Sequence, residues 1–429
     1  MPIPLEGNLL ARLLHWPIAP DNATPVQRKN FLNVQIDAIG IGLSAAAAPF
    51  LPVFLTRLGA TSFQVGLLTA MPAFTGFLLA VAVGHFLQRR RNIVPWFSGA
   101  RLLAITAYAL TGLVPFLVPR QYVVQAVLLV WAAATIPETI VGIAFSVVMN
   151  TVAGPRGRYE LLSRRWSILG LTTAIMTAMA GQVLHRLQFP ANYQLVFIGL
   201  SLGGLISYYY SSRIQLPDAE PRPRAVDLSL PQRVKGFVNL IRGERAFVSF
   251  TTKRFVYASG AALSAPIFPL YYVRVAQATD AWIGIFSTAQ TATLLVGYYL
   301  WTRQSRTRGA HFVLLCTTLG LALYPALTAA TRRVEWIALF AGLAGIFQAG
   351  LDLVFFDELM KTVLPQHSAT FVALAQTLQH VATMAAPLLG TALADRIGIG
   401  GSLMVSAILR LIAFLLFRWD REGQPTSEL

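Results

Sequence analysis

Residues 31–66 read FLNVQIDAIGIGLSAAAAPFLPVFLTRLGATSFQVG, and the end of this stretch occurs twice in the chain. The second copy, residues 265–284, reads APIFPLYYVRVAQATDAWIG and lies about 217 residues further on. Pro49, Pro52, Arg57 and Gly66 correspond in order to Pro266, Pro269, Arg274 and Gly284. We therefore expect the two halves of the chain to share one architecture.

The composition indicates a membrane protein. Of the 429 residues, 55% are hydrophobic and 12% are charged, and the mean hydropathy is +0.59. A soluble core cannot enclose so much apolar surface. Hydrophobic runs of 18 or more residues recur about a dozen times, and each can cross a hydrocarbon layer of roughly 30 Å. We predict an all-α polytopic membrane protein with twelve transmembrane helices in two pseudo-symmetric bundles of six.

The predicted spans and domains follow the hydrophobic pattern. The spans are residues 31–55, 62–86, 94–117, 121–149, 164–186, 191–212, 247–273, 281–301, 310–330, 334–360, 368–393 and 400–417. The domains are an N-terminal tail at 1–30, a first bundle at 31–212, a central loop at 213–245, a second bundle at 246–417 and a C-terminal tail at 418–429.

The net charge of +16 is distributed unevenly between the connections. Of the 34 Lys and Arg residues, about 25 fall on one side of the membrane and about 7 on the other. By the positive-inside rule the rich side is the cytoplasm. We therefore expect a multi-pass protein of the cytoplasmic (inner) membrane with both termini in the cytoplasm. Because this asymmetry accounts for the charge, the expected macromolecular partner is the lipid bilayer and not nucleic acid.

The connection between spans two and three carries a family motif in partial form. It reads Gly84-His-Phe-Leu-Gln88-Arg89-Arg90-Arg91-Asn92, which resembles the Gly-x-x-x-Asp-Arg-x-Gly-Arg-Arg/Lys pattern of the major facilitator superfamily. The two six-span halves joined by a cytoplasmic loop also resemble that superfamily, whose halves rock about a site at the midplane. The resemblance implies that Gly84, Gln88 and Arg89 belong to a cytoplasmic latch. Gln88 stands where the family has an acid, which puts that part of the latch in doubt.

The second half offers a more degenerate copy of this motif ending at Arg303. Arg306 follows it, and Asp357 and Glu358 approach the cytoplasmic end of span ten. We expect the two acids to bind Arg303, Arg306 or Arg410 as a gate or as a scaffold.

Three charged residues fall at similar depth inside the first bundle. They are Asp37 on span one, Arg101 on span three and Glu138 on span four. An ionised side chain costs at least about 2.5–3.5 kcal/mol at the bilayer centre, so such groups pair or function. We expect a cluster that binds substrate or couples protons, since burial and a nearby arginine shift a carboxylate pKa in opposite directions. The alternative is a fixed ion pair that only neutralises Arg101.

The second bundle carries its intramembrane charges differently. Asp352, near the middle of span ten, is the favoured candidate there for substrate or proton binding. Arg254 occupies the repeat position of Asp37, which suggests either a salt bridge between the halves or a coincidence.

Uncharged polar side chains provide further candidates. Span eleven carries Gln376, Gln379 and His380 near its middle, and the spacing of Gln376 and His380 places them on one helical face. They either line the cavity, with His380 as a proton relay, or form hydrogen bonds between helices. Gln290 on span eight and Gln348 on span ten are further cavity candidates.

The sequence provides no support for an enzyme. It contains no phosphate-binding loop, zinc motif or nucleophilic serine turn, and its single cysteine excludes a disulfide framework. We expect no cofactor and no metal.

We predict a monomeric secondary active transporter that moves a small solute by alternating access, coupled to protons and exporting amphipathic compounds. A nutrient uptake permease is one alternative. Another is a non-transporting assembly, pigment-handling or lipid-moving factor, which would hold Asp37, Glu138, Gln348 and Asp352 away from the cavity.

Overall fold

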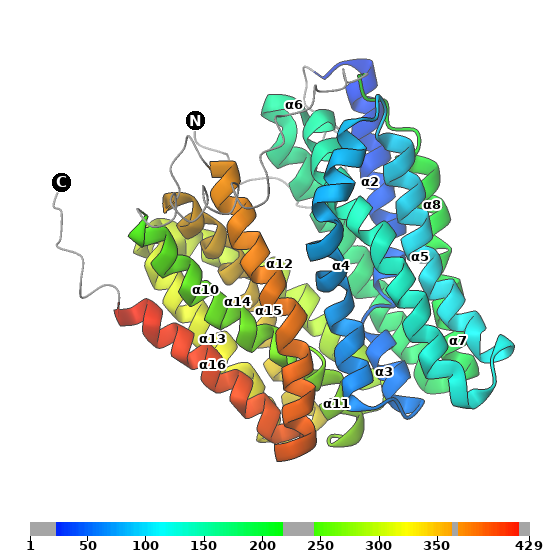
Figure 1. Cartoon of the computed structure of the whole chain (residues 1–429), viewed down its shortest axis with the longest axis vertical. Helices are drawn as coiled ribbons and strands as arrows, with labels where there is room; N and C mark the ends of the chain where they lie inside the picture. Colours follow the sequence, from blue (N-terminus) through cyan, green and yellow to red (C-terminus); the bar gives the residue numbers. More distant parts are fainter. Residues whose placement is uncertain (1–22, 218–243, 363–367, 420–429) are drawn as a thin grey trace, which may run out of the picture.

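The computed structural model describes residues 23–217, 244–362 and 368–419, and within these ranges every regular element is a helix (Figure 1). The predicted all-α class is confirmed. Most of the predicted tails and central loop lies outside the described residues. The chain forms two helical bundles, one from each half of the sequence, which lie side by side.

The helices follow the predicted spans with several interruptions. The first half contains α2 Pro25–Ala45, α3 Phe50–Arg57, α4 Ser62–Gln88, α5 Val94–Leu117, a 3-10 turn Arg120–Tyr122, α6 Val123–Arg186, α7 Ala191–Ser201 and α8 Gly203–Ser211. The second half contains α10 Arg245–Ser264, α11 Ile267–Arg274, α12 Asp280–Arg308, α13 Ala310–Ala329, α14 Val334–Lys361, α15 Ser368–Ile397 and α16 Ile399–Trp419.

Within the described residues, eight helical stretches are long and apolar enough to cross a membrane by their length and composition. They are Pro25–Arg57, Ser62–Ala80, Val94–Leu117, Arg120–Gly154, Leu161–Arg186, Ala310–Ala329, Val334–Leu359 and Ile399–Trp419. The other four predicted spans lie on α7 with α8, on α10 with α11, on α12 and on α15. The first of these is divided into helices of 11 and 9 residues, and the others carry more polar side chains. The count of twelve stays a prediction.

The first helix begins six residues before the predicted start of span one, because a capping box stops the chain from fraying there. The Thr24 hydroxyl accepts a hydrogen bond from the Gln27 amide at 3.2 Å, and the Thr24 amide donates to the Gln27 side chain at 3.1 Å. Pro25 follows the cap, where its missing N–H leaves no bond unmade. The same Thr-x-x-Gln box begins α4 at Thr61.

Spans four and five form α6, which consists of two helices that meet at a kink at Gly154. Gly154 has φ 65° and ψ −177°, which is a backbone conformation that other residues adopt only with strain. The bend turns the chain back between the two spans without a long loop.

The repeated prolines interrupt spans one and seven at equivalent positions. α2 ends at Ala45 and α3 begins after Pro49, while α10 ends at Ser264 and α11 begins after Pro266. Proline lacks the N–H that a continuing helix needs, but it fits the start of a new one. Each span is therefore a long helix followed by a short helix of 8 residues.

Three pairs of helices hold the two bundles together. α4 packs against α15, α6 packs against α12, and α3 packs against α11. A Cβ atom added to Gly181 on α6 would lie 3.1 Å from the Cα of Gly284 on α12, so glycines let these backbones approach closely. The bundles meet near the end that holds α3 and α11 and diverge toward the opposite end (Figure 1).

Inside the first bundle, α2 and α8 also pack backbone against backbone. A Cβ atom added to Gly40 would lie 2.6 Å from the Gly203 carbonyl oxygen and 2.6 Å from the Ser207 amide. A Cβ atom on Gly203 would clash with the Gly40 carbonyl in return. Neither glycine can be replaced unless the two helices separate.

Gly203→Ala is expected to lower the melting temperature of the purified protein, because overpacking of this kind costs about 1–3 kcal/mol. Thermal unfolding in detergent measures the effect. The control is Gly199→Ala on the preceding helix, where an added Cβ meets nothing within 4 Å. If the two variants melted at the same temperature, the close packing of α2 on α8 would be contradicted.

Candidate functional site

The structure brings Asp37 and Arg101 together as a buried ion pair. Asp37 is 0% exposed and Arg101 is 4% exposed. Both carboxylate oxygens of Asp37 lie 2.7 Å from Nη1 of Arg101. The guanidinium also lies over the Phe97 ring, 3.9 Å from its centroid. This geometry matches the fixed ion pair that the sequence left open beside a titrating role.

Two further side chains, which the sequence did not indicate, complete this cluster. Ser207 on α8 donates its hydroxyl to Asp37 at 2.6 Å. Arg165 on α6 is 3% exposed, and its Nη2 lies 3.8 Å from the other carboxylate oxygen. Arg165 lies at the start of predicted span five, and nothing in a single sequence shows that α6 directs it toward Asp37. The cluster holds two cations and one acid.

Glu138 does not join this cluster. It is partly buried on α6, and within the described part of the chain its carboxylate makes no hydrogen bond or ion pair. The expected cluster of Asp37, Arg101 and Glu138 is therefore wrong in one member. Asp37 and Arg101 do pair, but Ser207 and Arg165 complete the cluster in place of Glu138. Similar depth placed these residues at one level of the bundle, but helix rotation decides which side chains meet.

The repeated arginines make reciprocal contacts between the halves. Arg57, at the end of α3, donates from Nε to Asp280 at 3.0 Å and from Nη2 to the Ala278 carbonyl at 3.0 Å. Arg274, at the end of α11, donates to the Ser62 hydroxyl at 3.3 Å and to the Ala60 carbonyl. Each arginine thus binds the connection that follows the short helix of the other half.

These reciprocal arginine contacts obey the internal repeat. Ser62 is the first residue of α4 and Asp280 is the first residue of α12, so they occupy equivalent positions. Asp280 also accepts a hydrogen bond from the buried Tyr193 hydroxyl at 2.6 Å. In the sequence these two arginines are visible only as part of the repeat. Both lie on the side of the membrane with few Lys and Arg residues, and this unusual position could have indicated that they have specific partners there.

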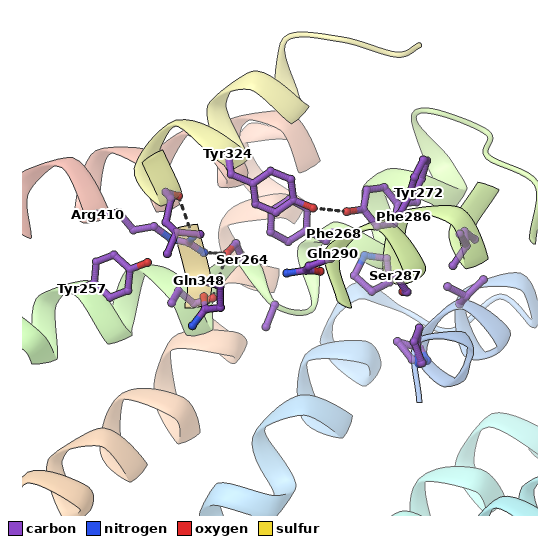
Figure 2. Close-up of a pocket in the computed structure, with 18 residues that line it drawn as sticks. Tyr257, Ser264, Phe268, Tyr272, Phe286, Ser287, Gln290, Tyr324, Gln348 and Arg410 are labelled. Atoms are coloured by element: carbon purple, nitrogen blue, oxygen red, sulfur yellow. Dashed lines mark hydrogen bonds between the residues drawn. The ribbon is translucent and has the colours of Figure 1, made fainter. Parts of the chain in front are cut away.

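A cavity of about 340 Å³, here called the break cavity, lies where α10 gives way to α11 (Figure 2). Pro49 and Pro52 of the first half line it, and α10 to α14 and α16 supply its other walls. Two of the predicted cavity residues, Gln290 and Gln348, lie in this wall. The interruptions of spans one and seven therefore border the same space.

Arg410 on α16 also lines the break cavity. It is 6% exposed and donates to the Leu321 carbonyl at 3.0 Å and to the Ser264 hydroxyl at 2.6 Å. Figure 2 shows its guanidinium directed toward Ser264, at the end of α10. From the sequence, Arg410 was expected only as a partner of Asp357 or Glu358, whereas the structure places it in the cavity wall.

A second cavity, the Asp352 cavity, adjoins the first. Its volume is about 360 Å³, and Arg254, Asp352, Gln376 and Gln379 are among its lining residues. Both cavities include Tyr257, Ala261 and Gln348 in their walls, so they lie next to each other along α10 and α14.

The groups in the Asp352 cavity pair with neutral side chains. Gln348 donates to Asp352 at 2.7 Å, and the Tyr298 hydroxyl donates to it at 3.3 Å. Arg254 donates to the Gln379 oxygen at 2.6 Å. The salt bridge suggested between Asp37 and Arg254 is wrong, because each residue has its partner inside its own half.

His380 lies away from both cavity walls. Its ring would be 3.8 Å from a Cβ atom at Gly76, which places it where α15 packs against α4. Gln376 precedes His380 by four residues and therefore lies on the same face of α15, but its side chain lines the Asp352 cavity. Of the predicted polar stripe, the two glutamines face the cavity.

The residues predicted to form the cytoplasmic latch lie at the end of the molecule opposite the reciprocal arginine contacts. Gly84 and Gln88 line a cavity of about 450 Å³ formed entirely by the first half. Arg89 is exposed at the end of α4. Across the described ranges, no side-chain hydrogen bond or ion pair joins Arg89, Arg303 or Arg306 to the opposite half.

The expected pairing of Asp357 and Glu358 with arginines is wrong for this conformation. Both acids bind Lys361, one turn further along α14, at 2.7 and 2.8 Å. Partial burial disfavours the charged lysine, but the hydrogen bonds and charges of the two acids outweigh it and raise the pKa of Lys361. A local i, i+3 or i, i+4 partner forms without ordering a second element, which favours it over distant arginines.

Comparisons with known proteins support one fold. The Major Facilitator Superfamily model matches residues 254–428. The structure is similar to that of the nucleoside transporter NupG, with 13% identity, a TM-score of 0.66 and coverage of 90% of this chain and 98% of that chain. No relative among curated proteins matches.

Two inward-facing bacterial structures are also similar. One is an unoccupied homologue of the human lysosomal transporter Spinster, with 14% identity, a TM-score of 0.68 and coverage of 95% of this chain and 100% of that chain. The other is a homologue of the iron transporter ferroportin, with 15% identity, a TM-score of 0.68 and coverage of 92% and 98%. At these identities the likeness shows the fold.

Asp37→Asn is expected to destabilise the protein by about 3–5 kcal/mol, because it leaves Arg101 and Arg165 buried without an acid. Thermal unfolding measures this, with the exposed Asp357→Asn as the control. The double variant Asp37→Asn/Arg101→Gln should recover part of the loss. An unchanged melting temperature for Asp37→Asn would contradict the fixed ion pair and favour a carboxylate that titrates.

Proposed function

We propose that this chain is a membrane transporter of the major facilitator superfamily and that it moves a small solute by alternating access. The family model over residues 254–428 and the fold shared with solved transporters favour a transporter over an enzyme. The proposal concerns the mechanism, the coupling and the direction.

The observation that carries the proposal is the position of the contacts between the halves. The reciprocal arginine contacts join the two halves at one end, and the bundles diverge at the other (Figure 1). The break cavity and the Asp352 cavity lie between these ends. Opening of the joined end would give such a cavity access to the opposite side of the membrane.

The non-transporting alternative fits this arrangement less well. A non-transporting protein was expected to hold Asp37, Glu138, Gln348 and Asp352 away from the cavity. In the structure Gln348 and Asp352 both line a cavity. Polar groups in a transmembrane cavity are costly unless they bind something.

A cross-linking experiment tests alternating access. In a Cys316→Ser background, cysteines replace Ser62 and Arg274, whose side chains are 3.3 Å apart. A bifunctional maleimide joins them and prevents this end from opening. Transport into proteoliposomes should stop after cross-linking of the double-cysteine protein, while each single-cysteine protein should keep, after treatment with the same reagent, the transport rate that it had before treatment. Transport that continues in the fully cross-linked protein would contradict the proposal.

We propose protons as the coupling ion and the cytoplasmic membrane as the location, with both termini in the cytoplasm. Glu138 and Asp352 are the candidate proton carriers, because neither forms an ion pair within the described residues. Asp37 is a weaker candidate because it forms a buried ion pair with Arg101. The aromatic cavity wall favours export of amphipathic compounds. We expect the monomer to be the working unit.

The coupling proposal predicts a specific loss. The double variant Glu138→Gln/Asp352→Asn should lose transport driven by a pH gradient but keep exchange of substrate at equal pH, since exchange needs no net proton movement. The substrate for this assay is the solute that most raises the melting temperature in a thermal-shift screen. Asp357→Asn is the control. Unchanged gradient-driven transport in the double variant would overturn the proton coupling.

A further inference from the structure

The break cavity contains one ionised side chain. Eighteen described residues line it, and Arg410 is the only one among them with a full charge at neutral pH. Its other polar side chains are hydroxyls and amides, such as those of Ser287 and Gln290. Arg410 is therefore the only full charge in the wall of the break cavity itself, while Asp352 and Arg254 lie in the wall of the adjoining cavity.

Arg410 has donors that the protein leaves unused. A guanidinium has five N–H groups, and two hydrogen bonds, to Leu321 and Ser264, are formed here. Nε is buried and has no hydrogen-bond partner. Within the described residues no carboxylate pairs with Arg410, in contrast to Arg101, which Asp37 neutralises.

A buried charge without a counterion is costly, and the cost is removed when an anion arrives. Leu321 on α13 and Ser264 on α10 hold the guanidinium between three helices, so its orientation is fixed before a ligand binds. Preorganisation of this kind increases the affinity for the anion.

Aromatic rings form the rest of the cavity wall. The rings belong to Tyr257, Phe268, Tyr272, Phe286 and Tyr324. Phe268 stacks on Tyr324 with ring centroids 4.7 Å apart, and the Tyr272 and Tyr324 hydroxyls are 2.9 Å apart. Figure 2 shows Phe268, Tyr272, Phe286 and Tyr324 together, with Arg410 apart from them, while Tyr257 lies beside Arg410. Such a wall provides contact area for a flat or aliphatic body.

We infer that the break cavity binds an organic monoanion, with its carboxylate against Arg410 and its apolar body against the aromatic rings. This inference rests on the proposed transport function, because it names the substrate class of the same cavity. An amine would be repelled by Arg410, and a neutral compound would leave the buried charge uncompensated.

Binding of matched ligands tests the inference. The purified full-length chain in nanodiscs is titrated with indole-3-acetate, indole-3-acetamide and tryptamine, and with octanoate, octanamide and octylamine. Thermal shift and calorimetry measure binding. In at least one series the carboxylate should bind tenfold or more tightly than the amide, since hydrogen bonds to charged groups contribute about that much, and the amine should not bind.

Two variants assign the selectivity to Arg410. Arg410→Gln should abolish the preference for the carboxylate. Ser264→Asp supplies an internal carboxylate next to Arg410, where the hydroxyl now lies 2.6 Å from Nη2. It should fold as an ion pair and lose carboxylate binding. Arg254→Gln, a change of the cation in the Asp352 cavity, should keep it.

The inference is overturned if neither series prefers the carboxylate, or if Ser264→Asp binds the carboxylate as tightly as the unaltered protein. Its failure can be separated from failure of the proposed function. Carboxylate-selective binding together with transport that survives the Ser62–Arg274 cross-link would uphold the inference and remove alternating access. If the protein instead transported amines and the cross-link stopped this transport, alternating access would be upheld and the inference about the carboxylate would be overturned.

Discussion

The hydrogen bonds that Arg57 and Arg274 donate across the halves are the contacts on which this conformation depends. Each arginine ends a short helix, where the negative end of the helix dipole favours a cation. Each binds a carbonyl and a side chain at the start of a helix in the opposite half. Because the two contacts are equivalent under the internal repeat, the halves are joined symmetrically at one end.

The same repeat also creates the cavity. Its prolines interrupt spans one and seven, and the residues at the two interruptions line one space of about 340 Å³. The short helix between a proline and its arginine has 8 residues, or roughly 12 Å at 1.5 Å per residue. A rigid element of that length connects the cavity wall to the contact between the halves. Movement at either end is therefore transmitted to the other.

The buried arginines differ in what compensates their charge. Arg101 has Asp37 as a bidentate partner within its bundle, so this pair belongs to the scaffold. Arg410 contacts a carbonyl, a hydroxyl and the Tyr257 ring but has no carboxylate partner within the described residues, and it faces a cavity. A charge that the protein itself does not compensate is suited to bind a ligand. This difference could not be read from the sequence, where both residues are single arginines inside hydrophobic spans.

Hydrophobic runs and the repeated Pro-x-x-Pro and Arg pattern determined the helical class, the division into halves and the family resemblance. These features are local, because a span needs only a length of apolar chain and a proline interrupts any helix. Similar depth brought Asp37 and Arg101 into one prediction, but it wrongly included Glu138 and missed Arg165. The direction in which a side chain points, and hence the groups it meets, depends on the rotation and packing of neighbouring helices. Only the tertiary structure decided that, and so only it separated the charges paired inside a bundle from the charges that face a cavity.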